Sequence, residues 1–375
     1  NYVKNLLSEP KVSAVCSMIE AINEPDILMK HNQTPQSVKI YTNTSEQNEE
    51  RGRIYASILK TTNQAVQEIN TEKNEDYKLG GFSLCMIWTH NDPIKSLYLR
   101  FAEGALDELD GEQAFDALTL HPYGGPTDDP EIGEDGRENP NYSSSILYKI
   151  RRMRGLFTGE TFINPTTGEE SVANDSVSGQ RYNYEIPGIW HTEFGYSSAK
   201  YKTGDSQSMC TGDDFKQAEL LLRGINIIKS DNLSDKVWIY DLIDDGMREN
   251  EEQFNYGIIN SKNHTTPYSA KYAYLAMSNF NKMIDGATYS KEEYSNNYCF
   301  VSKYDCGVRD VHLMWTSNPD GADLTYDFGE DCYYYDIFGN KLDETDVKAD
   351  GKYSLTMTPF YVVCGEDIKR QTSDF

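Results

Sequence analysis

The chain has 375 residues, of which 38% are apolar and 12% aromatic, enough for one large domain or two smaller ones. It carries 60 Asp and Glu against 35 Lys and Arg, and this formal charge of −25 argues against partners such as nucleic acid, anionic membranes or polyanionic sugars. The simpler reading of the charge is that it keeps a secreted protein soluble. No apolar run approaches the ~18 residues that span a bilayer.

The first seven residues contain neither a methionine nor a long apolar run, so we expect no signal peptide there and a chain that does not begin where a gene begins. Six Asn-x-Ser/Thr sites occur, close to the number expected by chance, and a secreted or cell-surface location is our expectation. These sites are Asn32, Asn43, Asn141, Asn174, Asn232 and Asn263.

Strands and helices are predicted to alternate over residues 1–285. The spacing of apolar residues and the positions of Pro, Gly and Asp predict strands over 12–22, 77–88, 114–120, 186–194 and 236–243. They predict helices over 49–70, 93–109, 141–157, 213–229 and 267–284, whereas 124–139 and 158–185 show no periodicity. This alternation favours a parallel sheet.

From about residue 286 the pattern changes to short strands separated by Gly, Asp, Asn and Pro, with no helical periodicity. The predicted strands are 299–303, 308–315, 324–328, 332–338, 353–358 and 361–364. We therefore expect two domains, an α/β domain over 1–285 and an antiparallel β-sandwich over 286–375.

The seven cysteines include no Cys-x-x-Cys pair. Cys16 and Cys85 fall inside predicted strands and are expected to be buried thiols. Four others lie in the β-rich segment and could form one or two disulfides, and the sequence does not decide the pairing. These are Cys299, Cys306, Cys332 and Cys364.

Two glutamates stand at the ends of predicted strands. Asn23-Glu24-Pro25 follows the first strand, and Glu193 lies in the segment Trp190-His191-Thr192-Glu193-Phe194-Gly195. Between them, His121-Pro122-Tyr123 ends another strand. A parallel α/β barrel presents its reactive groups at the carboxyl ends of its strands, so Glu24 and Glu193 are expected to face each other across a cleft. Two facing carboxyls are the minimum equipment for glycoside hydrolysis.

These motifs resemble those of the retaining (β/α)8-barrel glycosidases of clan A. Asn23-Glu24-Pro25 is similar to their strand four, 118–124 to strand six, 190–195 to strand seven and 237–242 to strand eight. The resemblance implies an α/β (β/α)8 TIM-barrel fold, Glu24 as acid/base and Glu193 as nucleophile. The β-rich segment is similar to the domain that follows the barrel in family 39 and related types.

Further roles follow from the same resemblance. It implies that Asn23 hydrogen-bonds the 2-hydroxyl of a sugar and that Tyr123, beside His121, orients the nucleophile. Burial and the charge of Glu193 are expected to raise the pKa of Glu24. We expect no cofactor and no metal, since no His-x-His or His-Glu-x-x-His spacing occurs.

Aromatic residues near these motifs are candidates for stacking on sugar rings. Trp238 and Tyr240 share strand parity and are expected to line the substrate side, with Trp88 a weaker candidate. Strict alternation from Glu193 would place His191 inside the barrel and Trp190 against the helices.

The front of the barrel departs from the clan pattern. Three strands precede the acid/base strand in clan A, whereas 23 residues precede Glu24 here. We expect further polypeptide to complete the barrel and a carbohydrate to be the substrate. The alternative function is a non-catalytic carbohydrate-binding or structural relative of the same fold.

Overall fold

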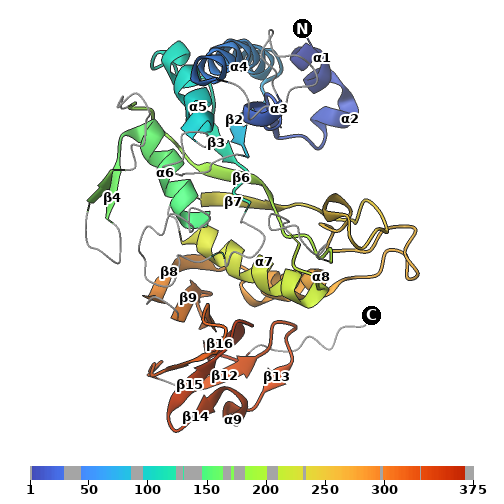
Figure 1. The fold of residues 1–375 in the computed structure, drawn as a ribbon, viewed down its shortest axis with the longest axis vertical. Helices are drawn as coiled ribbons and strands as arrows, with labels where there is room; N and C mark the ends of the chain where they lie inside the picture. The colour runs from blue at the N-terminus through green and yellow to red at the C-terminus, as the bar shows by residue number, and fades with distance from the viewer. Residues whose placement is uncertain are drawn as a thin grey trace. The chain divides into compact units, whose positions relative to one another are not determined.

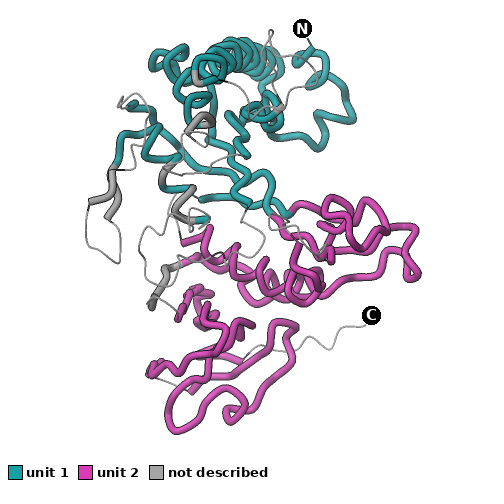
Figure 2. The backbone as a smooth tube through the Cα atoms, in the orientation of Figure 1, with its two compact units in different colours: residues 1–123, 138–194, 231–239 teal, residues 124–137, 195–230, 240–375 magenta. Residues whose placement is uncertain are grey.

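The computed structural model describes residues 2–28, 44–85, 96–123, 130, 146–163, 170–172, 182–200, 210–230, 234–295, 299–329 and 331–367. These residues belong to two compact units (Figure 2). Unit 1 comprises 1–123, 138–194 and 231–239, and unit 2 comprises 124–137, 195–230 and 240–375. A domain boundary at 285/286 remains a prediction.

Unit 1 is organised around a five-stranded parallel sheet (Figure 1). Its strands are β1 (Met18–Glu20), β2 (Lys78–Leu84), β3 (Ala117–Leu120), β6 (Ile189–Phe194) and β7 (Ser234–Ile239). They pair in the order β1-β2-β3-β6-β7, and each pair is parallel. The predicted parallel sheet is therefore confirmed, as a half-barrel of five strands.

The helices between these strands follow the predicted alternation. In unit 1 they are α1 (Tyr2–Ser8), α2 (Pro10–Ser13), α3 (Pro25–Leu28), α4 (Ser45–Lys73), α5 (Ser96–Leu109) and α6 (Ile146–Thr158). A short antiparallel hairpin, β4 (Thr161–Ile163) and β5 (Glu170–Val172), occupies the stretch without periodicity. The predicted strand over 12–22 is wrong at its start, because Pro10 opens α2 and the strand covers three residues.

Helix α4 begins earlier than its apolar pattern predicts, because Thr44 caps it. The Thr44 hydroxyl accepts from the Gln47 N–H, and the Gln47 side chain accepts from the Thr44 N–H. This reciprocal capping box satisfies two donors that a helix start leaves unpaired. The helix can therefore extend four residues ahead of its first apolar turn.

Helices α4 and α5 pack side by side through two glycines (Figure 1). A Cβ on Gly52 of α4 would lie 2.0 Å from the Phe101 carbonyl oxygen, and one on Gly104 of α5 would lie 2.1 Å from the Glu49 carbonyl oxygen. The two backbones are thus in contact, with no room for a side chain between them. Aromatic rings fill the core of unit 1, with edge-to-face contacts among Phe82, Phe115 and Phe157 and tilted contacts of Tyr55 with Phe82 and Phe101.

Unit 2 contains two long helices and most of the antiparallel strands. Its helices are α7 (Asp214–Lys229), η2 (Glu252–Phe254), α8 (Tyr272–Met283) and α9 (Glu344–Val347). Asp213 caps α7 as predicted, since its carboxylate accepts from the Phe215 and Lys216 N–H groups. The expectation of no helix after 286 is wrong by one turn, because Asp343 and Asp346 form a capping box that starts α9.

The antiparallel strands form two sheets. One has the order β13-β12-β16-β10-β9-β8 and the other β11-β15-β14. Their bounds are β8 (Thr288–Ser295), β9 (Cys299–Asp305), β10 (Arg309–Thr316), β11 (Ala322–Leu324), β12 (Cys332–Tyr335), β13 (Lys341–Leu342), β14 (Lys348–Ala349), β15 (Lys352–Leu355) and β16 (Phe360–Gly365).

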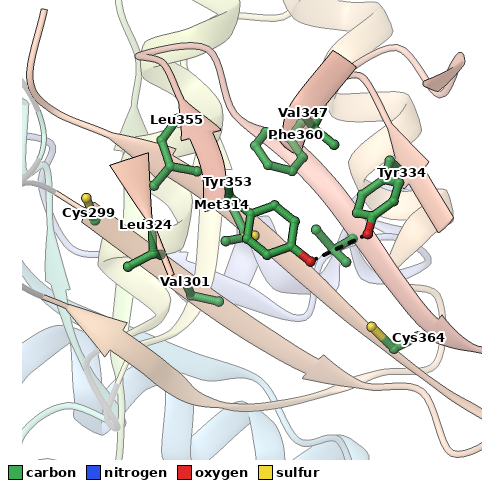
Figure 3. Close-up of a cluster of buried hydrophobic side chains, with 11 residues drawn as sticks. Cys299, Val301, Met314, Leu324, Tyr334, Val347, Tyr353, Leu355, Phe360 and Cys364 are labelled. Carbon is green, nitrogen blue, oxygen red and sulfur yellow. Dashed lines mark hydrogen bonds between the residues drawn. The ribbon is translucent and has the colours of Figure 1, made fainter. Parts of the chain in front are cut away.

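The two sheets contribute side chains to one buried cluster (Figure 3). Val301, Met314 and Val362 come from the larger sheet, and Leu324 and Leu355 come from the smaller one. Burial of apolar side chains from both sheets is what holds them together. That they form a complete sandwich remains a prediction.

One disulfide joins directly opposed residues of β12 and β16, Cys332 and Cys364. The other five cysteines, Cys16, Cys85, Cys210, Cys299 and Cys306, are not joined in disulfides. Cys16 and Cys85 are half-buried and lie just outside β1 and β2, so the expectation that both sit inside strands as buried thiols is wrong.

Some sequence predictions fall outside the described residues. They concern Trp88 and five of the glycosylation sites, Asn32, Asn43, Asn141, Asn174 and Asn232. Within the described part of the chain, no helix combines the length and the apolar character needed to cross a membrane.

Replacing Gly104 by Ala should destabilise the protein, because the added methyl group would overlap the backbone of α4. Overpacking of this kind costs about 1–3 kcal/mol. Urea unfolding followed by circular dichroism measures the change, with Ser57→Ala on the exposed face of α4 as the control. Equal stability of Gly104→Ala and the control would contradict the close helix contact.

Candidate active site

Glu24 lies four residues beyond the end of β1, in a strained backbone conformation. Its φ is +42°, in the left-handed region, and it precedes Pro25, which restricts its backbone further. The buried Arg51 guanidinium of α4 holds the next turn by donating to the Pro25 carbonyl at 3.1 Å and to the Asp26 carbonyl at 2.8 Å. A buried cation thus fixes a conformation that the local sequence alone disfavours.

His121 follows the end of β3 and stands between the two glutamates. Its ring is fully buried, with Nδ1 3.1 Å from Glu24 Oε1 and 3.6 Å from Glu193 Oε2. One oxygen of Glu24, one oxygen of Glu193 and a His121 ring nitrogen all lie within 4.8 Å of one another. The two carboxylates predicted to face each other therefore do so, with an imidazole in contact with both.

The Tyr123 side chain contacts Glu193. The Tyr123 hydroxyl donates to Glu193 Oε2 at 2.9 Å. Because β3 and β6 are neighbours in the sheet, the end of β3 brings this hydroxyl directly to the end of β6. The contact corresponds to the one that the resemblance implies for Tyr123.

A second, partly buried hydrogen-bond network lies behind His121, and the sequence interpretation missed it. Glu20 Oε1 accepts from the Thr192 hydroxyl at 2.7 Å and from the Ser83 hydroxyl at 2.6 Å. Thr192 Oγ1 also lies 3.1 Å from His121 Nε2. A charged residue inside an otherwise apolar strand is the signal that could have revealed Glu20, since a buried charge requires partners.

An irregularity in β2 aims Ser83 at Glu20. Phe82 and Ser83 both have positive φ, +88° and +44°, and the register of β2 against β3 shifts between Gly81 and Leu84. Such a bulge re-aims the side chain that follows it. The Ser83 N–H then donates to Thr119 Oγ1 at 2.8 Å, which locks the bulge in place.

The ionisation of the site differs from expectation at Glu24. Burial alone would raise the pKa of Glu24, but hydrogen bonds from His121 and the Cys85 thiol outweigh it, and the pKa lies below its ordinary value. Burial would likewise lower the pKa of His121, yet the carboxylates of Glu24, Glu193 and Glu20 hold it above the usual value. The predicted rise for Glu24 is therefore wrong in the free site.

Glu193 shifts in the opposite direction. Burial raises the pKa of Glu193, and the nearby His121 ring and the Tyr123 hydrogen bond offset this only in part. The charge of Glu24 adds to the rise. The pKa of Glu24 is lowered and that of His121 is raised, so both shifts favour a proton on the ring nitrogen over one on the Glu24 carboxylate.

The remaining predicted residues are placed as follows. Asn23 is exposed beside Glu24, so its amide is open to a ligand. Trp238 of β7 is 41% exposed, and its ring lies 6.4 Å from that of Trp190. Tyr240 belongs to unit 2, where its ring packs on Tyr256 at 5.4 Å.

Strict alternation along β6 predicts His191 inside the barrel and Trp190 against the helices, and both predictions are wrong. Trp190 pairs in register with Thr119, whose side chain shares a sheet face with Glu20. His191 lies on the other face, fully buried, with Nε2 2.9 Å from Ser234 Oγ. A register shift against β7 beyond His191 breaks the alternation before Glu193.

Among the described residues, Glu24, His121 and Glu193 are also the group whose ligand atoms come close enough to share a metal ion. Their atoms are already used in hydrogen bonds, however. His121 Nδ1 pairs with Glu24, and the Glu193 oxygen nearest it accepts from Tyr123.

No protein-family model matches the chain, and no curated protein sequence matches it either. Solved structures do match. A family 39 glycoside hydrolase from the gut symbiont Bacteroides cellulosilyticus WH2 gives a TM-score of 0.55 at 18% identity, over 83% of this chain and 54% of that one. A family 86 β-porphyranase from the human gut bacterium Bacteroides plebeius gives 0.56 at 9% identity, over 94% and 57%.

A conserved exported protein from Bacteroides fragilis is also similar, with a TM-score of 0.51 at 11% identity over 96% of this chain and 68% of that one. The chain thus spans little more than half the length of the two hydrolases. At these identities the likeness concerns the fold. The resemblance to family 39 and related glycoside hydrolases, drawn from strand-end motifs, is confirmed at that level.

Two of the buried histidines, His121 and His191, should titrate differently. His121 should lose its proton above pH 6.5, because carboxylates raise its pKa, whereas burial lowers the pKa of His191 to about 3 and keeps it neutral at neutral pH. Protonated His121 therefore stabilises the fold, and this contribution is lost as the pH rises through its folded pKa. Nitrogen-15 NMR of histidine-labelled protein, assigned with His121→Gln and His191→Gln, measures both. A His121 midpoint below 6.5 would contradict the assignment.

Proposed function

We propose that this chain carries the catalytic pair of a retaining glycosidase that cleaves β-linked bonds in a polysaccharide or oligosaccharide. The supporting observation is the position of the Glu24 and Glu193 oxygens within 4.8 Å of one another around His121. Retaining enzymes hold their carboxyls about 5–5.5 Å apart, whereas inverting enzymes leave about 6.5–9.5 Å for a water molecule. The close pair favours retention.

In the first step Glu193 is the nucleophile. Its carboxylate attacks the anomeric carbon while Glu24 donates a proton to the glycosidic oxygen, so that the carbon–oxygen bond to the leaving sugar breaks as the bond to Glu193 forms. Tyr123 holds the attacking carboxylate in line. We assign to Asn23, which is exposed and precedes Glu24 in the chain, a hydrogen bond to a sugar hydroxyl.

In the second step the deprotonated Glu24 acts as a base. It takes a proton from water, the resulting hydroxide bonds to the anomeric carbon, and the bond to Glu193 breaks. The anomeric configuration is inverted twice and is therefore retained. We propose Trp238 and Tyr240 as aromatic walls for the sugar; the half-exposed Trp238 ring on the side of the sheet that carries Thr192 supports the first of these.

We also propose that the half-barrel is completed to a (β/α)8 barrel by further polypeptide and that the β-rich segment forms a sandwich. Within the described residues, β1 and β7 are the outer strands of the sheet. Open edges of a parallel sheet expose unpaired N–H and C=O groups.

Residues 1–375 expressed alone should therefore associate in solution, as measured by light scattering. A monomer that unfolds cooperatively and hydrolyses a glycoside would argue against the added polypeptide.

Similarity to an exported protein supports an exported location.

Glu193→Ala should lower turnover of aryl β-glycosides by about 10³-fold or more, because no covalent intermediate can form. Glu24→Ala should spare substrates with good leaving groups in the first step, and azide should restore their turnover as a β-glycosyl azide. Product configuration is read by proton NMR.

Glu185→Ala, which removes an exposed glutamate of unit 1, is the matched control and should keep full activity. Products of inverted configuration, or equal losses in the control, would rule out the assigned roles. Sugar binding without turnover in the wild type would favour the non-catalytic alternative.

A further inference from the structure

The hydroxyls around Glu20 define the direction of each hydrogen bond. The Ser83 hydroxyl donates to Glu20 Oε1 at 2.6 Å, and the Thr119 hydroxyl, 2.9 Å from that of Ser83, directs its own hydrogen to the Gly81 carbonyl at 3.0 Å. Thr192 directs its single hydroxyl hydrogen to Glu20 Oε1 as well, at 2.7 Å. An ionised carboxylate only accepts, and a hydroxyl has one hydrogen to give. The Thr192 oxygen can therefore only accept from His121.

This direction fixes one proton on the imidazole. With Thr192 Oγ1 as the acceptor at 3.1 Å, Nε2 of His121 must carry a hydrogen. A neutral ring with Nε2–H has a lone pair on Nδ1, which would face Glu24 Oε1 at 3.1 Å and Glu193 Oε2 at 3.6 Å. A lone pair opposite carboxylates is repulsive. The His121–Glu24 pair thus retains a second proton.

We infer that Glu20 is a positioning residue that acts through the Thr192 hydroxyl to keep Nε2 of His121 protonated, so that a further proton is stored between Nδ1 and Glu24. This inference rests on the proposed function for its use in catalysis. His121 then holds the proton that Glu24 later donates. Glu20, acting through Thr192, keeps the ring in the form that carries this proton.

The proton held between Nδ1 of His121 and Glu24 explains how Glu24 can act as an acid although it is a carboxylate in the free site. When a sugar displaces water, the proton moves from Nδ1 to Glu24 Oε1, leaving a neutral ring that keeps Nε2–H. Glu24 then transfers this proton to the glycosidic oxygen as the bond breaks. In the second step the proton that Glu24 takes from water returns to Nδ1, so the cycle restores the starting state.

Several charged or titratable groups surround the imidazole and enter its titration. Glu20 and Glu24 come from β1 and the turn after it, and Glu193 comes from β6. Cys85 follows the end of β2, Tyr123 follows the end of β3, and the neutral His191 comes from β6. The carboxylates raise the pKa of His121 through their charges. Removing the Thr192 hydroxyl leaves these charges in place, so it tests the hydrogen bond from Nε2 to Thr192 by itself.

The test is Thr192→Val, which keeps the shape of the side chain and removes the hydroxyl. Without an acceptor for Nε2–H, the neutral Nδ1–H form becomes accessible, since it still donates to Glu24. The His121 midpoint should then fall by about one pH unit or more, and nitrogen-15 NMR should show Nδ1–H at neutral pH. Thr192→Ser should restore the wild-type spectrum. Glu20→Gln should also lower the His121 midpoint, because it removes a carboxylate charge. If Thr192→Val does not fold, the midpoint is measured in Glu20→Gln instead.

Ser234→Ala is the matched control, because it removes a hydroxyl facing Nε2 of another buried histidine, His191. It should leave the His121 signals unchanged. An Nδ1–H neutral form in the wild type, or an unchanged midpoint in both Thr192→Val and Glu20→Gln, would overturn the inference. The spectra do not depend on turnover, so an inactive protein with the expected tautomers would refute the proposed function alone. In an active protein, the basic limb of the pH–rate profile for poor leaving groups should shift with the midpoint.

Discussion

The buried imidazole of His121 is the interaction on which the candidate site depends. Two carboxylates whose oxygens lie within 4.8 Å repel each other by about 3 kcal/mol at an effective dielectric constant of 20. Both are also partly removed from water, which further disfavours their charges. A protonated ring in contact with both offsets these costs. The ring is itself fully buried and keeps its charge because carboxylates surround it. None of the three groups would hold its state without the others.

The backbone around this site is strained where it carries polar side chains. Glu24, Phe82 and Ser83 have positive φ values, and none of them is glycine. Such conformations cost about 1–3 kcal/mol each and persist when their surroundings over-determine them. Arg51 supplies this restraint next to Glu24, and Thr119 supplies it at Ser83. The strain lies where side chains must point along directions that a regular strand does not offer.

Much of the fold could be predicted because strand order follows from local pattern. Alternating apolar strands and helices, each ending in Pro, Gly or a polar motif, predict a parallel sheet whose carboxyl ends meet, and that brings Glu24, His121, Tyr123 and Glu193 together. The faces of β6 could not be predicted, because the register shift beyond His191 is set by pairing with β7 rather than by local sequence. The role of Glu20 was missed for a related reason. Its partners Ser83 and Thr192 lie 63 and 172 residues away in the sequence.

The same features bear on the choice between an enzyme and a binding module. A surface that only binds neutral sugars needs aromatic faces and hydrogen-bond partners, and solvent-exposed groups can supply both. It does not need two carboxylates held together against their repulsion, or a buried ring whose nitrogens are assigned by a chain of hydroxyls ending at Glu20. Such a network lowers the stability of the fold unless every polar group in it has a hydrogen-bond partner. They are useful where a proton must be held in one place and moved to another. The arrangement around His121 therefore supports the proposed acid–base chemistry over binding alone.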